Sequence, residues 1–260
     1  MPSRGRSVSW PDAVLAGVLS TLILLAWSSL WFWRHSPQGH LLLHGFTYQQ
    51  MASGSPLRFA LIFISAWTLM TISMMMPTSV PLLVLFHRMV RKRAYAAWLV
   101  AIVVFGYLAI WISSGALLQI INWILQAGAA RMAWPAAAPW VVSAVILGIA
   151  GLYQFSSLKY ACLEKCRSPF SFLVERWQGG SESMQALRIG LAHGLFCVGC
   201  CWSLMLLMFL VSAQSLTAMM VLGAAMALEK NASWGRHLTA PLGVLLLAGA
   251  AATFVIGIRA

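Results

Sequence analysis

The sequence predicts an all-α protein, a polytopic bundle of transmembrane helices that forms a single integral membrane domain over residues 1–260. Hydrophobic residues make up 61% of the chain and charged residues only 8%. The mean hydropathy of +0.83 is too high for a soluble domain. Long apolar stretches separated by short polar breaks recur along the chain, and we expect each to cross the bilayer.

Seven stretches of this kind are predicted, at about 12–33, 58–86, 95–124, 139–157, 188–212, 216–229 and 238–258. The sixth is shorter than the roughly 20 residues that a transmembrane helix needs, so six spans are also consistent with the sequence. The first follows Arg4 and Arg6 but is too long for a signal peptide and lacks an A-x-A cleavage site. It is therefore expected to be an uncleaved span.

Basic residues gather at one end of alternate spans. They are Arg4 and Arg6, then His87, Arg88, Arg91, Lys92 and Arg93, then Lys159, Lys165, Arg167, Arg176 and Arg188. The positive-inside rule makes these segments cytoplasmic and places the N-terminus in the cytoplasm. The expected location is the bacterial cytoplasmic (inner) membrane. The net charge of +12 is thereby explained by membrane orientation, and nucleic-acid binding is rejected.

The fifth stretch carries unusual chemistry for lipid depth. It reads GLAHGLFCVGCCWSLMLLM from Gly190 to Met208. At 3.6 residues per turn, one helical face would carry all the candidate ligands. These are His193, Cys197, Cys200, Cys201, Met205 and Met208. Imidazole, thiolate and thioether groups suit soft or borderline metal ions. The alternative is that the cysteines only pack as small apolar residues.

Glycines in the same stretch predict close helix packing. Gly190 and Gly194 form a G-x-x-x-G pattern that lets a neighbouring helix approach, and Gly106 and Gly115 of the third stretch offer similar positions.

Two other segments add sulfur. The second stretch contains Met70, Met74 and Met75 before Pro77, which lacks an N–H and is expected to free a carbonyl group nearby. Thioethers bind Cu(I) but few other biological ions, although methionine is also an ordinary core residue. After the fourth stretch, Cys162 and Cys166 stand four residues apart and would share one face of a helical extension.

Two weaker candidates complete the set of possible ligands. Glu229, at the end of the sixth stretch, is either a functional carboxylate or a surface charge paired with Lys230. His35, His40 and His44, in the loop after the first stretch, could capture a metal ion at the outer face but form no tight motif.

Four sequence blocks together resemble a known family. They are WTLMTISMMMP, KYACLEKCRSPFSF, HGLFCVGCCWSLMLLMF and ALEK, and they extend roughly from Trp67 to Lys230. They are similar to predicted metal-binding integral membrane proteins that include the membrane copper chaperones of laccase-type and tyrosinase-type polyphenol oxidases. The resemblance implies copper handling beside a small soluble companion metallochaperone. The residues that it implicates are Cys162, Cys166, Cys197, Cys200, Cys201, Trp202, Met70, Met74, Met75, Met205, Glu229 and Lys230.

The expected function is a copper chaperone that is not an enzyme, binds Cu(I), and passes it to an oxidase-like copper enzyme on the outer side of the membrane. No P-loop or ATPase motif is present, which argues against active pumping. Two rivals stay open: an accessory structural subunit of a membrane metallo-oxidase, and a thiol-disulfide oxidoreductase that uses the C-x-x-C-C thiols. A haem protein with His87 and His193 as ligands is a weaker alternative, because these residues lie at different depths.

Overall fold

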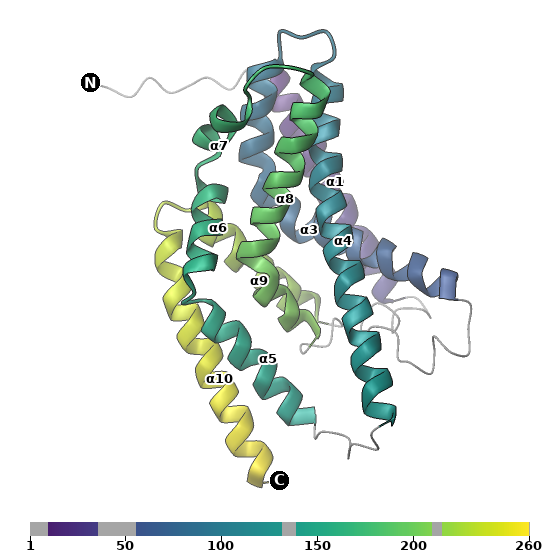
Figure 1. Cartoon of the computed structure of the whole chain (residues 1–260), viewed down its shortest axis with the longest axis vertical. Coiled ribbons are helices and arrows are strands. Elements are labelled where there is room, and N and C mark those ends of the chain that lie inside the picture. Colours follow the sequence, from purple (N-terminus) through teal and green to yellow (C-terminus); the bar gives the residue numbers. More distant parts are fainter. Residues whose placement is uncertain (1–9, 36–55, 132–138, 210–214, 260) are drawn as a thin grey trace.

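The computed structural model describes residues 10–35, 56–131, 139–209 and 215–259, and this part of the chain contains helices and no strands. The helices are α1 Trp10–Arg34, α3 Pro56–Val90, α4 Ala96–Arg131, α5 Pro139–Tyr153, α6 Ser157–Arg167, α7 Pro169–Arg176, α8 Glu182–Leu206, α9 Leu216–Asn231 and α10 Thr239–Arg259. Short 3-10 turns follow α8 at Leu207–Phe209 and precede α10 at Gly235–Leu238. The expected all-helical architecture is confirmed (Figure 1).

In the described residues, five helices are long and apolar enough to cross a membrane. They lie at Ala13–Arg34, Ala60–Val90, Ala96–Ile124, Glu182–Leu206 and Gly235–Arg259. Helices α5 and α6 would together make a sixth span, although the chain bends by 62° between them. The sixth stretch of the sequence corresponds to α9, whose 16 residues rise only about 24 Å at 1.5 Å per residue, less than a bilayer core of about 30 Å.

Helices α4 and α8 form a tightly packed parallel pair at the centre of the bundle (Figure 1). A Cβ on Gly190 would come within 2.2 Å of the Val103 carbonyl oxygen. One turn further along both helices, Gly194 lies against Tyr107 and Ile110. The predicted G-x-x-x-G approach is therefore confirmed, because the two glycines lie directly on the backbone and side chains of α4.

The basic turn after α3 lies against the start of α8 at one end of the bundle, which we call the basic end. Arg93, in the turn after α3, forms an ion pair of 2.8 Å with Glu182 in the first turn of α8. In Figure 1 the α3–α4 turn and the start of α8 lie together at the top of the view. The turn after the second expected span and the start of α8 thus lie on one side, whereas Lys159, which the sequence placed among the cytoplasmic residues, is fully buried inside the bundle.

Helix α3 continues through Pro77, and the carbonyl that this proline frees finds a partner. The missing N–H leaves the Ser73 carbonyl without its usual partner four residues on. Trp27 Nε1 of α1 donates to the Ser73 oxygen at 3.2 Å. The expected free carbonyl is thus present, and it ties α1 to α3.

The bend between α5 and α6 places α6 alongside the middle of α8. Ser156 caps α6, because its side-chain oxygen accepts a hydrogen bond from the Lys159 backbone N–H at 3.1 Å. This N–H lies in the first turn of the helix and has no acceptor within the helix itself. Helix α10 runs antiparallel to α5, with Gly257 against Trp140 at one end and Gly243 against Phe155 at the other. Figure 1 shows this pair at the lower left, with α6 continuing upward from it.

Candidate metal centre

The cysteines of α8 face the cysteines of α6. Cys197, Cys200 and Cys201 are almost completely buried, because the face of α8 that carries them points into the bundle. Cys162 is also buried, Cys166 is partly buried, and all five thiols are free. The structure therefore brings together two cysteine groups that lie more than thirty residues apart in the sequence.

The distances between sulfur atoms fit ligands that could share an ion. The Sγ atoms of Cys166 and Cys200 lie 3.9 Å apart, and those of Cys200 and Cys201 lie 3.5 Å apart. With metal–sulfur bonds of about 2.3 Å in tetrahedral geometry, two ligand sulfurs would be roughly 3.8 Å apart. Among the described residues, no group of three or more His, Cys, Asp or Glu side chains is already arranged to hold an ion. A site with more thiolates would therefore need side-chain movement, or thioethers as further ligands.

Gly199 allows α6 to lie close to α8. A Cβ on residue 199 would lie only 2.7 Å from the Cys162 Sγ, so the sulfur occupies the space that a side chain there would need. Tyr153, at the end of α5, donates its hydroxyl hydrogen bond to the Gly199 carbonyl. A larger residue at position 199 would push Cys162 away from the α8 cysteines.

Methionines surround the thiols in the same buried core. The buried members are Met74, Met75, Met205 and Met208, and Met70 packs against them while partly exposed. The packing joins the methionines of α3, of α8 and of the 3-10 turn after it to Cys162 and the α8 cysteines in one cluster. The sequence-predicted sulfur residues of three helices thus converge, and we call this group the sulfur core.

Helix α9 supplies two methionines that the sequence reasoning did not assign to the site. Met219 and Met226 belong to the sulfur core, whereas Met220 is 60% exposed and points away. Close to them, Gly223 lies against the Met74 side chain, and a Cβ on residue 223 would be 3.6 Å from Met74 Cγ. The seven-residue spacing of Met219 and Met226 was the available signal, because residues at that interval share one helical face.

Lys230 of α9 enters the sulfur core as a buried cation. Its Nζ lies 2.9 Å from Cys197 Sγ and 3.2 Å from Thr78 Oγ1. The hydroxyl of Tyr107 lies 3.2 Å from the same sulfur. Cys197 therefore has a hydrogen-bonding partner on α4 and a charged partner on α9.

Glu229 does not pair with Lys230. Both of its carboxylate oxygens accept hydrogen bonds from Lys159 Nζ of α6, at 3.1 and 3.0 Å, and neither side chain is more than 2% exposed. Gln154 Oε1 is a further acceptor for Lys159, and Arg167 donates to the Glu229 carbonyl. The sequence alternative of a surface pair with Lys230 is wrong, since Glu229 is buried and bound to another lysine.

Comparison with known families identifies the chain. Residues 64–253, well over half of it, match the PpoB2 family, which is described as a copper chaperone. The chain belongs to the PpoB2 copper chaperone family. The resemblance stated from the sequence is confirmed, and the matched range contains every cysteine and methionine of the sulfur core. No curated protein and no solved structure matches the chain.

In this PpoB2 family member, His193 lies at the basic side of the sulfur core. Its Nε2 is 3.0 Å from Ser79 Oγ, and its ring stacks on Tyr107 with centroids 5.5 Å apart. Its Nδ1 is buried and has no hydrogen-bond partner. His193 thus reaches Cys197 through Tyr107, and its role as a metal ligand stays a prediction.

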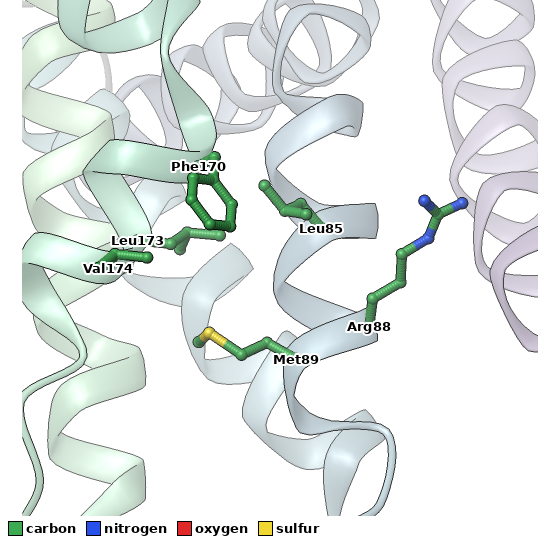
Figure 2. Close-up of a pocket in the computed structure, with 6 residues that line it drawn as sticks. All are labelled: Leu85, Arg88, Met89, Phe170, Leu173 and Val174. Carbon is green, nitrogen blue, oxygen red and sulfur yellow. The ribbon is translucent and has the colours of Figure 1, made fainter. Parts of the chain in front are cut away.

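A shallow apolar pocket of the PpoB2 chain lies away from the sulfur core, between the end of α3 and α7. It has a volume of about 270 Å³ and is lined by Leu85, Arg88, Met89, Phe170, Leu173 and Val174. Figure 2 shows the α7 side chains facing Leu85 and Met89, with Arg88 directed away from them. No candidate ligand from the sequence lines this pocket.

The loop histidines of this copper chaperone contribute little to the described structure. His35 is exposed, and its Nδ1 lies 2.8 Å from the Trp31 carbonyl oxygen, one turn earlier. His40 and His44 lie outside the described residues. A metal site in this loop stays a prediction.

Proposed function

We propose that this copper chaperone holds Cu(I) in the sulfur core and passes it to a copper-dependent oxidase at the outer face of the bacterial cytoplasmic membrane. The observation that carries the proposal is the convergence of α6 and α8 thiols with α3, α8 and α9 thioethers in one buried cluster. Thiolate and thioether ligands favour Cu(I) over harder ions. Packing alone would not require so many sulfur atoms to meet.

The order of sulfur types along the bundle supports outward transfer. Helices α3 and α8 run in opposite directions, and the Ser79–His193 contact lies nearest the basic end. Along α8 the thiols come next, and Met74 and Met75 stand about one turn from Ser79 on α3. Met205 follows on α8 and Met208 in the 3-10 turn after it, while Met70 lies one further turn along α3. Thioethers hold Cu(I) where thiols would be oxidised, so this order suits an ion that moves from the cytoplasm outward.

The proposed ligands are those of the expected set: Cys162, Cys166, His193, Cys197, Cys200, Cys201, Met70, Met74, Met75, Met205 and Met208. Glu229 stays in the set as a prediction, although its carboxylate binds Lys159 here. The proposed partners are the recipient copper enzyme, membrane lipid and a small soluble companion metallochaperone that delivers copper at the basic end. We expect no catalytic activity.

Cu(I) stoichiometry of the purified full chain tests the proposal. Competition with a chromogenic Cu(I) chelator should reveal at least one tightly bound ion in the wild type. Cys197→Ser, Cys201→Ser and Met70→Leu should each weaken binding by about tenfold or more, because each removes a soft ligand. Met220→Leu is the matched control, since this methionine is exposed on the outer face of α9.

Three results would contradict the proposal or favour a rival. A wild-type chain with reduced, intact thiols and no Cu(I) affinity would exclude the chaperone site. Unchanged assembly with an oxidase in the Cys197 and Cys201 variants, without metal in the chain, would favour a structural subunit. A thiol count that switches reversibly by two between oxidising and reducing buffers would favour an oxidoreductase.

A further inference from the structure

Lys230 carries a positive charge that its neighbour in the sequence does not neutralise. The Lys230 side chain is 5% exposed, and its ammonium contacts Cys197 Sγ and Thr78 Oγ1. Glu229 points to Lys159 instead, since successive helical residues face directions about 100° apart. A buried charge needs a compensating partner, and the carboxylate beside it is already bound elsewhere.

Besides the Tyr107 phenol and the His193 imidazole, the ionisable groups that interact with the Lys230 ammonium are four thiols. They are Cys197, Cys200 and Cys201 of α8 and Cys166 of α6. The other close neighbour, Thr78, contributes a neutral hydroxyl from α3. The electrostatic environment of Lys230 is therefore the sulfur core, and any ion bound there experiences the lysine charge.

We propose that Lys230 determines specificity by making the sulfur core prefer a singly charged metal ion to a doubly charged one. This inference rests on the proposed function. A monovalent ion on two thiolates has a net charge of −1, and the lysine brings the site to zero. The complex of a divalent ion with the same two thiolates is already neutral. The lysine then adds a positive charge that nothing in the buried site compensates.

The preference is a charge effect and does not depend on ligand softness. For any fixed set of ligands, the lysine charge repels a divalent ion twice as strongly as a monovalent one. The difference equals the repulsion energy between two unit charges at that distance. At a few ångströms in a partly screened interior, such an interaction changes a binding constant by about tenfold or more. Methionine and cysteine ligands alone would leave Zn(II) as a competitor for the thiols.

The experiment compares monovalent and divalent binding in the purified full chain. Cu(I) affinity is measured by competition with a chromogenic chelator, and Co(II) affinity by thiolate-to-cobalt charge-transfer absorption. Lys230→Met and Lys230→Gln remove the charge, and the Gln variant keeps a polar head group. Lys230→Arg keeps the charge, and Lys165→Met, at an exposed ion pair on α6, is the control.

We expect the neutral variants to lower the ratio of Cu(I) to Co(II) affinity by at least about tenfold. Lys230→Arg and Lys165→Met should keep this ratio within about threefold of the wild type, because neither changes the charge of the core. An unchanged ratio in a folded neutral variant overturns the inference while leaving the proposed function intact. If neither neutral variant folds, wild-type protein that binds Co(II) through thiolates as tightly as Cu(I) overturns it. A wild type without Cu(I) affinity overturns the proposed function instead.

Discussion

The buried pair of Lys159 and Glu229 gives the sharpest stability prediction. The substitution Glu229→Gln replaces the carboxylate by a neutral amide of nearly the same shape. The Lys159 ammonium, 0% exposed, would then have only neutral oxygens around it, including Gln154 Oε1. Removing one partner of a buried pair costs about 3–5 kcal/mol, and we expect a loss of unfolding free energy in this range.

An exposed pair in the same region provides the control. Lys165 and Glu175 join α6 to α7 at 3.0 Å, but their side chains are 42% and 50% exposed. Glu175→Gln should cost less than about 1 kcal/mol, because water screens an exposed pair. Both variants are compared by denaturant or thermal unfolding of the purified chain in one detergent. Equal stability of the two variants would refute the reasoning.

A double substitution separates the structural role of Glu229 from a role in metal binding. Replacing the whole pair, with Lys159→Met and Glu229→Leu, leaves no orphaned charge and should recover most of the lost stability. A structural role predicts that this variant still binds Cu(I) with wild-type affinity. Restored stability with lost Cu(I) binding would instead support Glu229 as a ligand.

Two further predictions concern helix packing. Gly190→Ala places a Cβ 2.2 Å from the Val103 carbonyl, so α4 must move away by about 1 Å, and we expect a net loss of about 1–2 kcal/mol in unfolding free energy. Gly148→Ala on α5, where nothing lies within 4 Å, should gain about 0.5–1 kcal/mol, and an equal response of the two glycine variants would contradict the packing argument. Trp67→Phe removes the 2.8 Å hydrogen bond from the Trp67 indole N–H to the Trp111 carbonyl. This loss should lower the unfolding free energy by about 1 kcal/mol in the same assay. No change would mean that this bond does not join α3 to α4.

Periodicity explains why so much of α8 was predictable from the sequence. A helix fixes which residues share a face, so the burial of Cys197, Cys201 and Met205 on one side follows from their spacing. The same logic predicted that Gly190 and Gly194 would receive a neighbouring helix. Both inferences depend only on the local geometry of a helix, which tertiary packing does not change.

Contacts between distant segments were not predictable in the same way. The pairing of Cys166 with Cys200 depends on the bend after α5, which the sequence did not indicate. Glu229 and Lys230 are adjacent in the sequence, which suggested a mutual pair, yet the helix turns them toward different partners. Helical geometry alone argued against that pair, but only the tertiary arrangement identifies Lys159 and Cys197 as the partners.

The composition of the sulfur core also has a consequence for biosynthesis. Because α3, α6, α8 and α9 all contribute to it, the core cannot assemble until α9, which ends at Asn231, has been translated and inserted. A nascent chain that has emerged only as far as α6 carries two cysteines without their α8 neighbours. Synthesis and insertion of the chain as far as α9 therefore precede the first opportunity for the finished core to take up an ion, which orders membrane insertion before metal loading.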